Sequence, residues 1–287
     1  MRLGIGALVI WGCAMERMKQ AGKAVFFDID GTLINIKNGW TQIRPAVRTE
    51  IKRLREAGYR TFIASGRPYA YLDPKIADSK LFDGFVLMNG AAVMMGHAVI
   101  YDDPLPKELV QEIVALSEGN GIEYILEGLH DVYLRPEFKA TEQFCRDIDV
   151  NVRGFVRDYD LAHVDAYKIE FYARDPGGNG VYEHLLKKPE LTGLMDPYHK
   201  ENMELYASSI SKGTGICHAL DYLGIPRTES YAFGDGLNDM EMMETVGMGL
   251  VMENARPQLK EKASHILPSV DEDGVAFGIR RYILGEE

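Results

Sequence analysis

The stretch that decides the fold spans residues 23–33 and reads KAVFFDIDGTL. Residues 24–27 form an apolar run without polar alternation, which is typical of a strand buried on both faces of a parallel sheet. Asp28 and Asp30 follow at the end of this strand, and their spacing points both carboxylates in roughly the same direction. Gly31 permits a tight turn that exposes them. The stretch therefore predicts a buried strand whose carboxyl end presents two acids.

Strands and helices alternate after this stretch. Pro45 occupies a favoured first helical position, apolar residues follow at helical spacing, and Gly58 ends the predicted helix. Residues 60–64 and 84–88 predict two further strands. This order favours a parallel sheet with helices on both faces.

The pattern changes after Gly90. Residues 93–101 predict a hairpin that turns at Gly96-His97. Helices and short, neighbouring strands then follow one another without the earlier alternation, which is typical of an α+β domain. The predicted helices cover 107–120 and 136–147 with a short one after 180, and the predicted strands cover 122–126, 132–134, 168–172 and 191–195.

The parallel pattern resumes near Ser211. The predicted elements are a helix over 212–223, a strand over 230–233, a helix over 237–246, a strand over 249–252 and a last helix over 275–284. We therefore predict an α/β protein with a Rossmann-like, doubly wound parallel sheet core formed by 23–90 and 201–287. An α+β cap domain, 91–200, is inserted into that core.

Composition narrows the function classes. The chain has 287 residues, of which 46% are apolar, and a formal charge of −11 from 43 acidic and 32 basic residues. This is ordinary for a globular protein, and a broad nucleic-acid surface is not expected because backbone binding needs clustered cations. Cys13, Cys145 and Cys217 form no CxxC pair and no disulfide framework, which favours a reducing, cytoplasmic location. The seven histidines show no metal-ligand spacing.

The first 22 residues are treated as an extension and left out of the fold prediction. Their apolar run, 3–13, resembles a weak signal segment but is too short to span a bilayer. A misassigned start codon explains it equally well. We expect no membrane association.

Three more motifs follow predicted strands or precede predicted helices. Ser65-Gly66-Arg67 offers a hydroxyl and backbone N–H groups that could bind phosphate oxygens, although Ser and Gly also cap helices without any ligand. Lys212 begins a helix, where an ammonium suits a phosphate, yet a solvated surface lysine is the simpler interpretation of that residue alone. Residues 234–239 read GDGLND and place two acids four residues apart, which a helix cap would also explain. Their joint occurrence at strand ends favours chemistry, because that edge of an open α/β sheet binds ligands.

Together the four motifs resemble the haloacid dehalogenase (HAD) superfamily of phosphotransferases, specifically the Cof-like phosphatases with a type IIB cap. The resemblance extends from about Lys23 to the C-terminus and includes DIDGTL (28–33), SGR (65–67), the Lys212 segment and GDGLND (234–239). Residues 89–91 (NGA) and 271–275 (DEDGV) are also similar to that family.

The resemblance implies a nucleophile, a proton carrier and a cofactor. It makes Asp28 the nucleophile and Asp30 the general acid and base. It gives Asp28, the Asp30 carbonyl and Asp235 to Mg²⁺, and it assigns Asp239 to the support of the metal shell or of Lys212.

The resemblance also implies a phosphate site, formed by Ser65 and Lys212 with help from Gly66 and Asn238. The chemistry is consistent, because a carboxylate and a phosphate dianion repel each other unless a cation lies between them.

We therefore predict a Mg²⁺-dependent phosphatase that hydrolyses a small phosphate monoester, such as a sugar phosphate, through an aspartyl-phosphate intermediate. The inserted cap is expected to close over the strand ends and to exclude folded phosphoproteins. A phosphomutase of the phosphomannomutase type and a non-catalytic phosphometabolite-binding protein remain alternatives. Candidate specificity residues in the cap are Tyr133, Arg135, His163 and Lys168.

Overall fold

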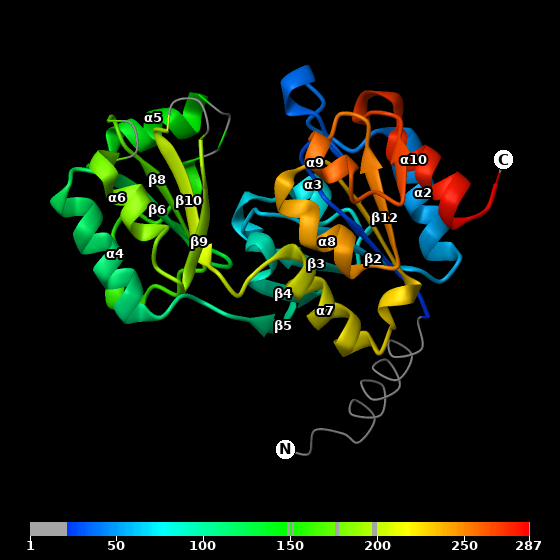
Figure 1. Ribbon diagram of the computed structural model, residues 1–287, viewed down its shortest axis with the longest axis horizontal. Coiled ribbons are helices and arrows are strands. Elements are labelled where there is room, and N and C mark those ends of the chain that lie inside the picture. The colour runs from blue at the N-terminus through cyan, green and yellow to red at the C-terminus, as the bar shows by residue number, and fades with distance from the viewer. Residues whose placement is uncertain (1–21, 148–149, 151, 176–177, 197–199, 287) are drawn as a thin grey trace, which may run out of the picture. The chain divides into compact units, whose positions relative to one another are not determined.

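The computed structural model describes residues 22–147, 150, 152–175, 178–196 and 200–286 (Figure 1). The chain forms two compact units. The first, called the core unit here, contains 22–66, 73–101 and 211–286, and the second, the cap unit, contains 67–72 and the described part of 102–210. The expected N-terminal extension lies outside the described residues, apart from Gly22. No helix in the described ranges is long and apolar enough to cross a membrane.

The core unit is built on an eight-stranded sheet with the order β13-β12-β11-β1-β2-β3-β4-β5. Six neighbouring strands are parallel, and β4 pairs antiparallel with β3. The strands are β1 (Ala24–Phe27), β2 (Arg60–Ala64), β3 (Gly84–Leu87), β4 (Ala92–Met95), β5 (Ala98–Asp102), β11 (Ser230–Gly234), β12 (Met248–Met252) and β13 (His265–Leu267).

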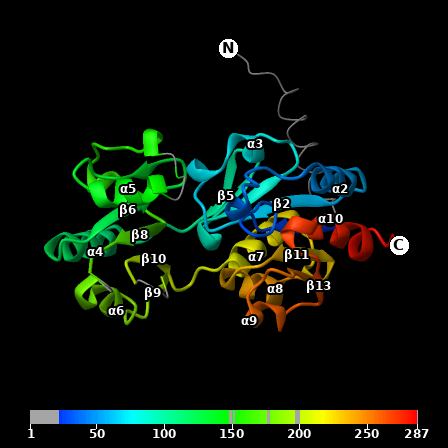
Figure 2. The same ribbon diagram turned by 90° about the horizontal axis from the view of Figure 1, so that it is seen from above.

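Helices cover both faces of this sheet, as Figures 1 and 2 show. One face carries α2 (Pro45–Glu56) and α10 (Gly274–Gly278), and the other carries α7 (Lys212–Leu223) and α8 (Met240–Thr245). Strand β1 is buried along its whole length because its side chains alternate between the two helical layers. Phe26 packs towards α7 and α8, while Phe27 stacks on Phe233 at a ring distance of 5.0 Å. The predicted fold class is therefore confirmed.

Short helices complete the core unit. They are α3 (Pro74–Ala77) and α9 (Pro257–Lys260), and each begins at a proline, as expected for the first helical position. Residues Ile279–Ile283 continue α10 as a π-helical turn.

The cap unit is a five-stranded antiparallel sheet with the order β7-β6-β8-β10-β9. One face packs against α4 (Lys107–Gly119) and α6 (Val181–Leu185), and the other packs in part against α5 (Lys139–Asp147). The strands are β6 (Glu123–Glu127), β7 (Val132–Tyr133), β8 (Lys168–Tyr172), β9 (Leu191–Met195) and β10 (Asn202–Ala207).

Both boundaries of the inserted unit lie about ten residues later in the sequence than the local pattern predicted. The hairpin of β4 and β5 continues the core sheet beyond β3 instead of opening the insertion. Strand β10, which the sequence analysis did not predict, pairs with β8 and β9 and so belongs to the cap sheet. The reason in both cases is hydrogen bonding between strands, which the local pattern does not encode.

Candidate active site

The site lies at the point where the order of the core strands reverses. From β1 the sheet extends through β2 and β3 on one side, and through β11, β12 and β13 on the other. The connections that follow β1 and β11 therefore run in opposite directions. In an open α/β sheet this produces a crevice at the carboxyl ends of the two strands. Asp28 follows β1 directly, and Asp235 follows β11 directly.

Lys212 occupies the centre of this crevice. Its Nζ donates to Asp28 Oδ1 and to Asp239 Oδ1, each at 2.6 Å, and its side chain is fully buried. Ser211 fixes the start of α7 through a capping box with Thr214, which holds Lys212 at the first helical position. Burial alone would lower the pKa of Lys212, but Asp239 and Asp28 raise it above its usual value. Lys212 is therefore a buried ammonium, and the interpretation of a solvated surface lysine is wrong.

Asp239 is held on both of its carboxylate oxygens. Oδ1 accepts from Lys212, and Oδ2 accepts from the backbone N–H groups of Asp235 and Gly236, each at 2.9 Å. This side chain thus fixes the position of the lysine and of the loop that presents Asp235. Of the two supporting roles considered for Asp239, the structure displays the contact with Lys212.

Asp235 faces the loop that follows β1. Its Oδ1 accepts from Thr32 Oγ1 at 3.2 Å, and its Oδ2 accepts from Asn254 Nδ2 at 3.3 Å. A Cβ atom on Gly31 would lie 2.2 Å from Asp235 Oδ2, and Gly31 also has a φ of +86°, so only glycine fits there. Burial, and then the charge of Asp239, raise the pKa of Asp235 to about 7.

Asp28, Asp235 and Asp239 form an acidic triad, with one oxygen of each lying within 4.8 Å of the others. Burial, followed by the charges of Asp239 and Asp235, raises the pKa of Asp28 although Lys212 opposes the shift. One ammonium against three carboxylates leaves an excess of two negative charges. A divalent cation with oxygen ligands would balance that excess, so the residues fit a metal of this type. Asp30 has an exposed side chain and does not belong to the triad, although its charge contributes to the raised pKa of Asp235.

Three of the predicted phosphate-binding residues, Ser65, Gly66 and Asn238, follow β2 and β11. Ser65 is buried at the end of β2, and a Cβ on the adjacent Gly66 would lie 3.0 Å from Asn89 Oδ1 and 3.7 Å from Asn238 Nδ2. Asn238 donates from Nδ2 to Asn89 Oδ1 at 3.1 Å. The structure therefore brings Gly66, Asn89 and Asn238 together beside Ser65.

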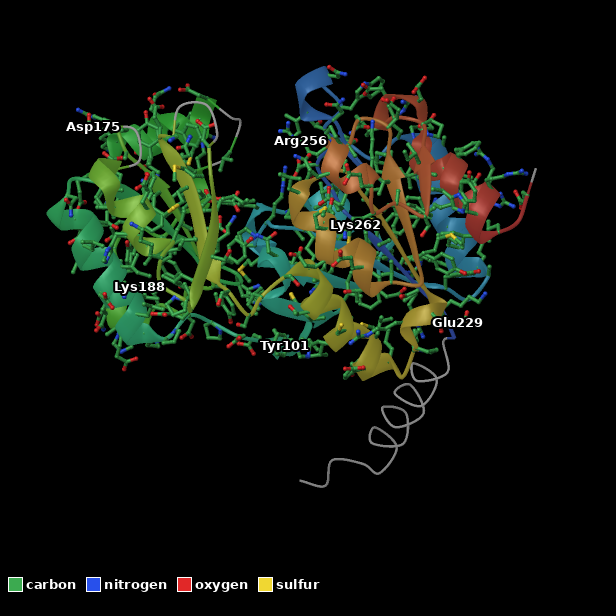
Figure 3. The ribbon with its side chains drawn as sticks, in the orientation of Figure 1. Tyr101, Asp175, Lys188, Glu229, Arg256 and Lys262 are labelled. Atoms are coloured by element: carbon green, nitrogen blue, oxygen red, sulfur yellow. The ribbon has the colours of Figure 1, made fainter. Side chains whose placement is uncertain are left out.

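Two asparagines belong to this arrangement although no role was assigned to them from the sequence. Asn89 is buried with a left-handed φ of +55°, and its Nδ2 has no hydrogen-bond partner among the described residues. Asn254 Nδ2 donates to Gly31 O at 2.8 Å and to Asp235, while its Oδ1 accepts from Val270 N at 2.9 Å. Asn89 comes two residues after the end of β3, and Asn254 two residues after the end of β12, so the strand-end argument could have found both. Arg256, labelled in Figure 3, precedes α9 and donates its backbone N–H to Asp235 O at 3.1 Å.

The candidate specificity residues lie in the cap unit, where Tyr133 and Arg135 both pack on Tyr159. Tyr133 packs edge-on against Tyr159, and Arg135 bonds Tyr124 Oη at 3.1 Å. His163 is exposed, with its Nδ1 2.9 Å from Asp160. Lys168 is the fourth candidate, and its side chain is buried among glutamates from three strands.

Comparison with known proteins agrees with this geometry. Residues 25–279 match the model of the haloacid dehalogenase-like hydrolases. The chain belongs to this family. It is 30% identical to YkrA of Bacillus subtilis over 90% of this chain and 96% of that protein. It is also 28% identical to YitU of Bacillus subtilis, named as a 5-amino-6-(5-phospho-D-ribitylamino)uracil phosphatase, over 90% of this chain and 96% of that protein.

A similar solved structure is that of BT4131, described as a sugar phosphatase of HAD subclass IIB. It superposes with a TM-score of 0.77 at 27% identity and covers 91% of this chain and 99% of the other. The match to a Cof-like, subclass IIB phosphatase that the motifs indicated is thus confirmed. The chain is an enzyme, a HAD-type phosphatase that acts on phosphoric monoesters.

Proposed function

We propose that the enzyme hydrolyses a small phosphate monoester with Asp28 as nucleophile and an aspartyl phosphate as intermediate. The observation that carries this proposal is the position of Lys212 Nζ, 2.6 Å from both Asp28 and Asp239 in a buried crevice. The ammonium holds one oxygen of Asp28, which leaves the other oxygen of that carboxylate to attack phosphorus. Once a phosphoryl group is in place, the same ammonium is positioned to stabilise its charge.

The acidic triad supports a magnesium site in the same crevice. Mg²⁺ would be held by Asp28, Asp235 and the carbonyl of Asp30, and it would neutralise charge on the transferring phosphoryl group. Asp239 would act as a positioning residue, because both of its oxygens already accept hydrogen bonds. Ser65, Gly66 and Asn238 would bind the remaining phosphoryl oxygens, and Asn89 would orient Asn238.

Asp30 is suited to proton transfer in both halves of the reaction. It lies two residues after the nucleophile, and its side chain is exposed and outside the triad. A protonated Asp30 would give its proton to the leaving alkoxide. The resulting carboxylate would then take a proton from the water that hydrolyses the aspartyl phosphate.

The proposed substrate class is a small phosphorylated metabolite that is a sugar phosphate or carries a sugar-like chain. Two observations support it. More than a hundred residues between Ser65 and Lys212 form a unit of their own, as expected for a substrate-closing domain. The similar proteins with stated substrates act on a sugar phosphate and on a phosphorylated ribityl compound.

A phosphate-release screen tests the proposal. The purified enzyme would be assayed with Mg²⁺ and with EDTA against sugar phosphates, nucleotides and phosphorylated cofactors, with a folded phosphoprotein as the large substrate. We expect Mg²⁺-dependent release from at least one small ester and little from the phosphoprotein. Conversion of a hexose 1-phosphate into its 6-phosphate without free phosphate would instead identify a phosphomutase. The absence of both products with every ester would contradict the proposed substrate class.

A further inference from the structure

A basic hollow in the core unit is lined by none of the residues of the acidic triad. It has a volume of about 630 Å³ and is lined by residues 39–45, Arg48 and Lys75. These lining residues carry three cations and no carboxylate, although the whole chain has a formal charge of −11. A local concentration of positive charge on an acidic protein attracts anions to that position and not to the surface at large.

Two of the three cations are free to bind a ligand. Arg48 and Lys75 make no ion pair with any carboxylate of the described residues. Arg44 is already committed, since its Nε lies 3.0 Å from Asp273 Oδ1 and its Nη1 donates to Asp271 O. Arg44 therefore forms a fixed wall, while Arg48 and Lys75 have no ion-pair partner among the described residues.

The helix that borders the hollow adds to this charge. Helix α2 has 12 residues, no side chain caps its N-terminus, and its first turn contains no acidic residue. The positive end of the helix dipole therefore lies at the hollow, where Pro45 and Arg48 form part of the lining. Both contributions favour a phosphate or another multiply charged anion.

An aromatic surface completes the hollow. Trp40 is 47% exposed, and the Arg44 guanidinium carbon lies 5.1 Å from the centre of its ring. The hairpin that carries Trp40 is held in place, because Asn35 exchanges backbone hydrogen bonds with Trp40 and its side chain bonds Asp271 at 3.1 Å. A rigid, half-exposed indole beside free cations is suited to a planar ring that carries phosphates.

We propose that this hollow is a second ligand site, which binds a phosphorylated heteroaromatic molecule through Arg48, Lys75 and Trp40. The ring stacks on Trp40, and the phosphate groups contact the two free cations and the start of α2. The site is built from residues outside the acidic triad and the phosphate-binding residues, so it does not depend on the reaction proposed for Asp28.

Tryptophan fluorescence gives a direct test, because the chain has only two tryptophans, Trp11 and Trp40. A Trp11→Phe, Asp28→Asn variant keeps Trp40 as its single tryptophan and lacks the proposed nucleophile. It would be titrated in EDTA with ADP, with tripolyphosphate and with adenosine. We expect a saturable change in Trp40 emission with ADP, weaker binding of tripolyphosphate because it lacks the ring, and no binding of adenosine because it lacks the charge.

Charge-removing variants in the same background locate the site. Arg48→Gln and Lys75→Gln are each expected to weaken ADP binding about tenfold. Lys52→Gln is the matched control, since Lys52 is exposed on the same helix but does not line the hollow. Far-ultraviolet circular dichroism and the melting temperature of each variant would verify that it is folded. No emission change with millimolar ADP, an equal response to adenosine, or equal weakening by Lys52→Gln would overturn the proposal.

Discussion

Two buried lysines, one in each unit, have similar surroundings and different positions. Lys212 lies at the start of α7 with two carboxylates at 2.6 Å, and Lys168 lies within β8 with Glu170, Glu127 and Glu204 at 2.9, 3.2 and 3.4 Å. The glutamates around Lys168 come from three adjacent strands, so this group links the middle of a sheet. Burial and ion pairing therefore do not by themselves indicate a catalytic lysine.

What distinguishes Lys212 is where its partners lie. Asp28 and Asp239 belong to loops at the carboxyl ends of parallel strands, where a ligand can enter. Their carboxylates, with that of Asp235, also exceed the charge of the lysine, so this cluster fits a divalent cation. The cluster in the cap unit has its residues on regular strands and, in our account, stabilises that unit.

The largest expected effect comes from the carboxylates that contact the two lysines. Asp28→Asn should lower phosphate release from p-nitrophenyl phosphate by at least about a thousandfold, because an amide is a poor nucleophile. Glu127→Gln is the matched change beside Lys168, and it should leave the turnover of folded enzyme within about threefold. Steady-state kinetics with circular dichroism would check both, and comparable losses in the two variants would remove the distinction between the clusters.

The lysines themselves provide the next comparison. Lys212→Met should reduce kcat by about a hundredfold to a thousandfold, since it removes a donor to the transferring group. Lys168→Met should instead lower the free energy of unfolding by about 3–5 kcal/mol, because it leaves the buried Glu127 without its cation. Calorimetry and p-nitrophenyl phosphate turnover would separate the two outcomes. A large loss of turnover in a well-folded Lys168→Met protein would place that lysine in the reaction.

Asp235 is expected to make the metal-free enzyme less stable as the pH rises. Its pKa is about 7 in the folded protein, above the value of an unfolded aspartate, so between about pH 4 and pH 7 the folded state binds more protons. The stability that this site contributes is complete below about pH 4 and is lost as the pH rises through 7. In EDTA at pH 8, Asp235→Asn should therefore be more stable than the natural protein, by about 2 kcal/mol or less after solvent screening.

The same variant should respond weakly to magnesium. Added Mg²⁺ should raise the melting temperature of the natural protein but not that of Asp235→Asn. Thermal unfolding at pH 5 and pH 8, with EDTA and with Mg²⁺, measures both effects. An Asp235→Asn protein that Mg²⁺ stabilises as strongly as the natural one would contradict the ligand set.

The smallest expected effect concerns the support of Asp235. Asn254→Ala removes the donor to Asp235 Oδ2 and to Gly31 O, and it should raise the Mg²⁺ concentration for half-maximal activity about tenfold with little change in kcat. Asn120→Ala is a suitable control, because Asn120 is an exposed asparagine at the end of α4. Activity would be measured against Mg²⁺ concentration for both variants. An unchanged Mg²⁺ concentration for half-maximal activity in Asn254→Ala would exclude this supporting role.

Most of the strands of both units were predictable because each is a compact run of mainly apolar residues. The predicted bounds of residues 60–64, 168–172 and 191–195 agree with β2, β8 and β9. The membership of β4, β5 and β10 was not predictable, since the sheet that a strand joins depends on distant partners. The predicted boundaries between the two units were therefore wrong by about ten residues, although most helices and strands were predicted.

The candidate site was predictable to the extent that it follows strand ends. That rule led to Asp28, Ser65 and Asp235, and the structure brings these regions to one crevice. The burial of Lys212 could not be read from the sequence, because a lysine in a polar segment usually lies in water and only tertiary packing encloses it. Asn89 and Asn254 lack the charge that singles out a catalytic residue, so they went without a role.

Detection of a phosphorylated Asp28 tests the central claim most directly. The enzyme would be mixed with a substrate from the screen and Mg²⁺, quenched in acid within one turnover, and digested with trypsin, which cleaves after Lys23 and Lys37. We predict a phosphoryl group on Asp28 in the peptide 24–37, located by fragmentation mass spectrometry, and none in Asp28→Asn. If the phosphoryl group is found on another residue during turnover, such as Ser65 or Asp30, the account is contradicted.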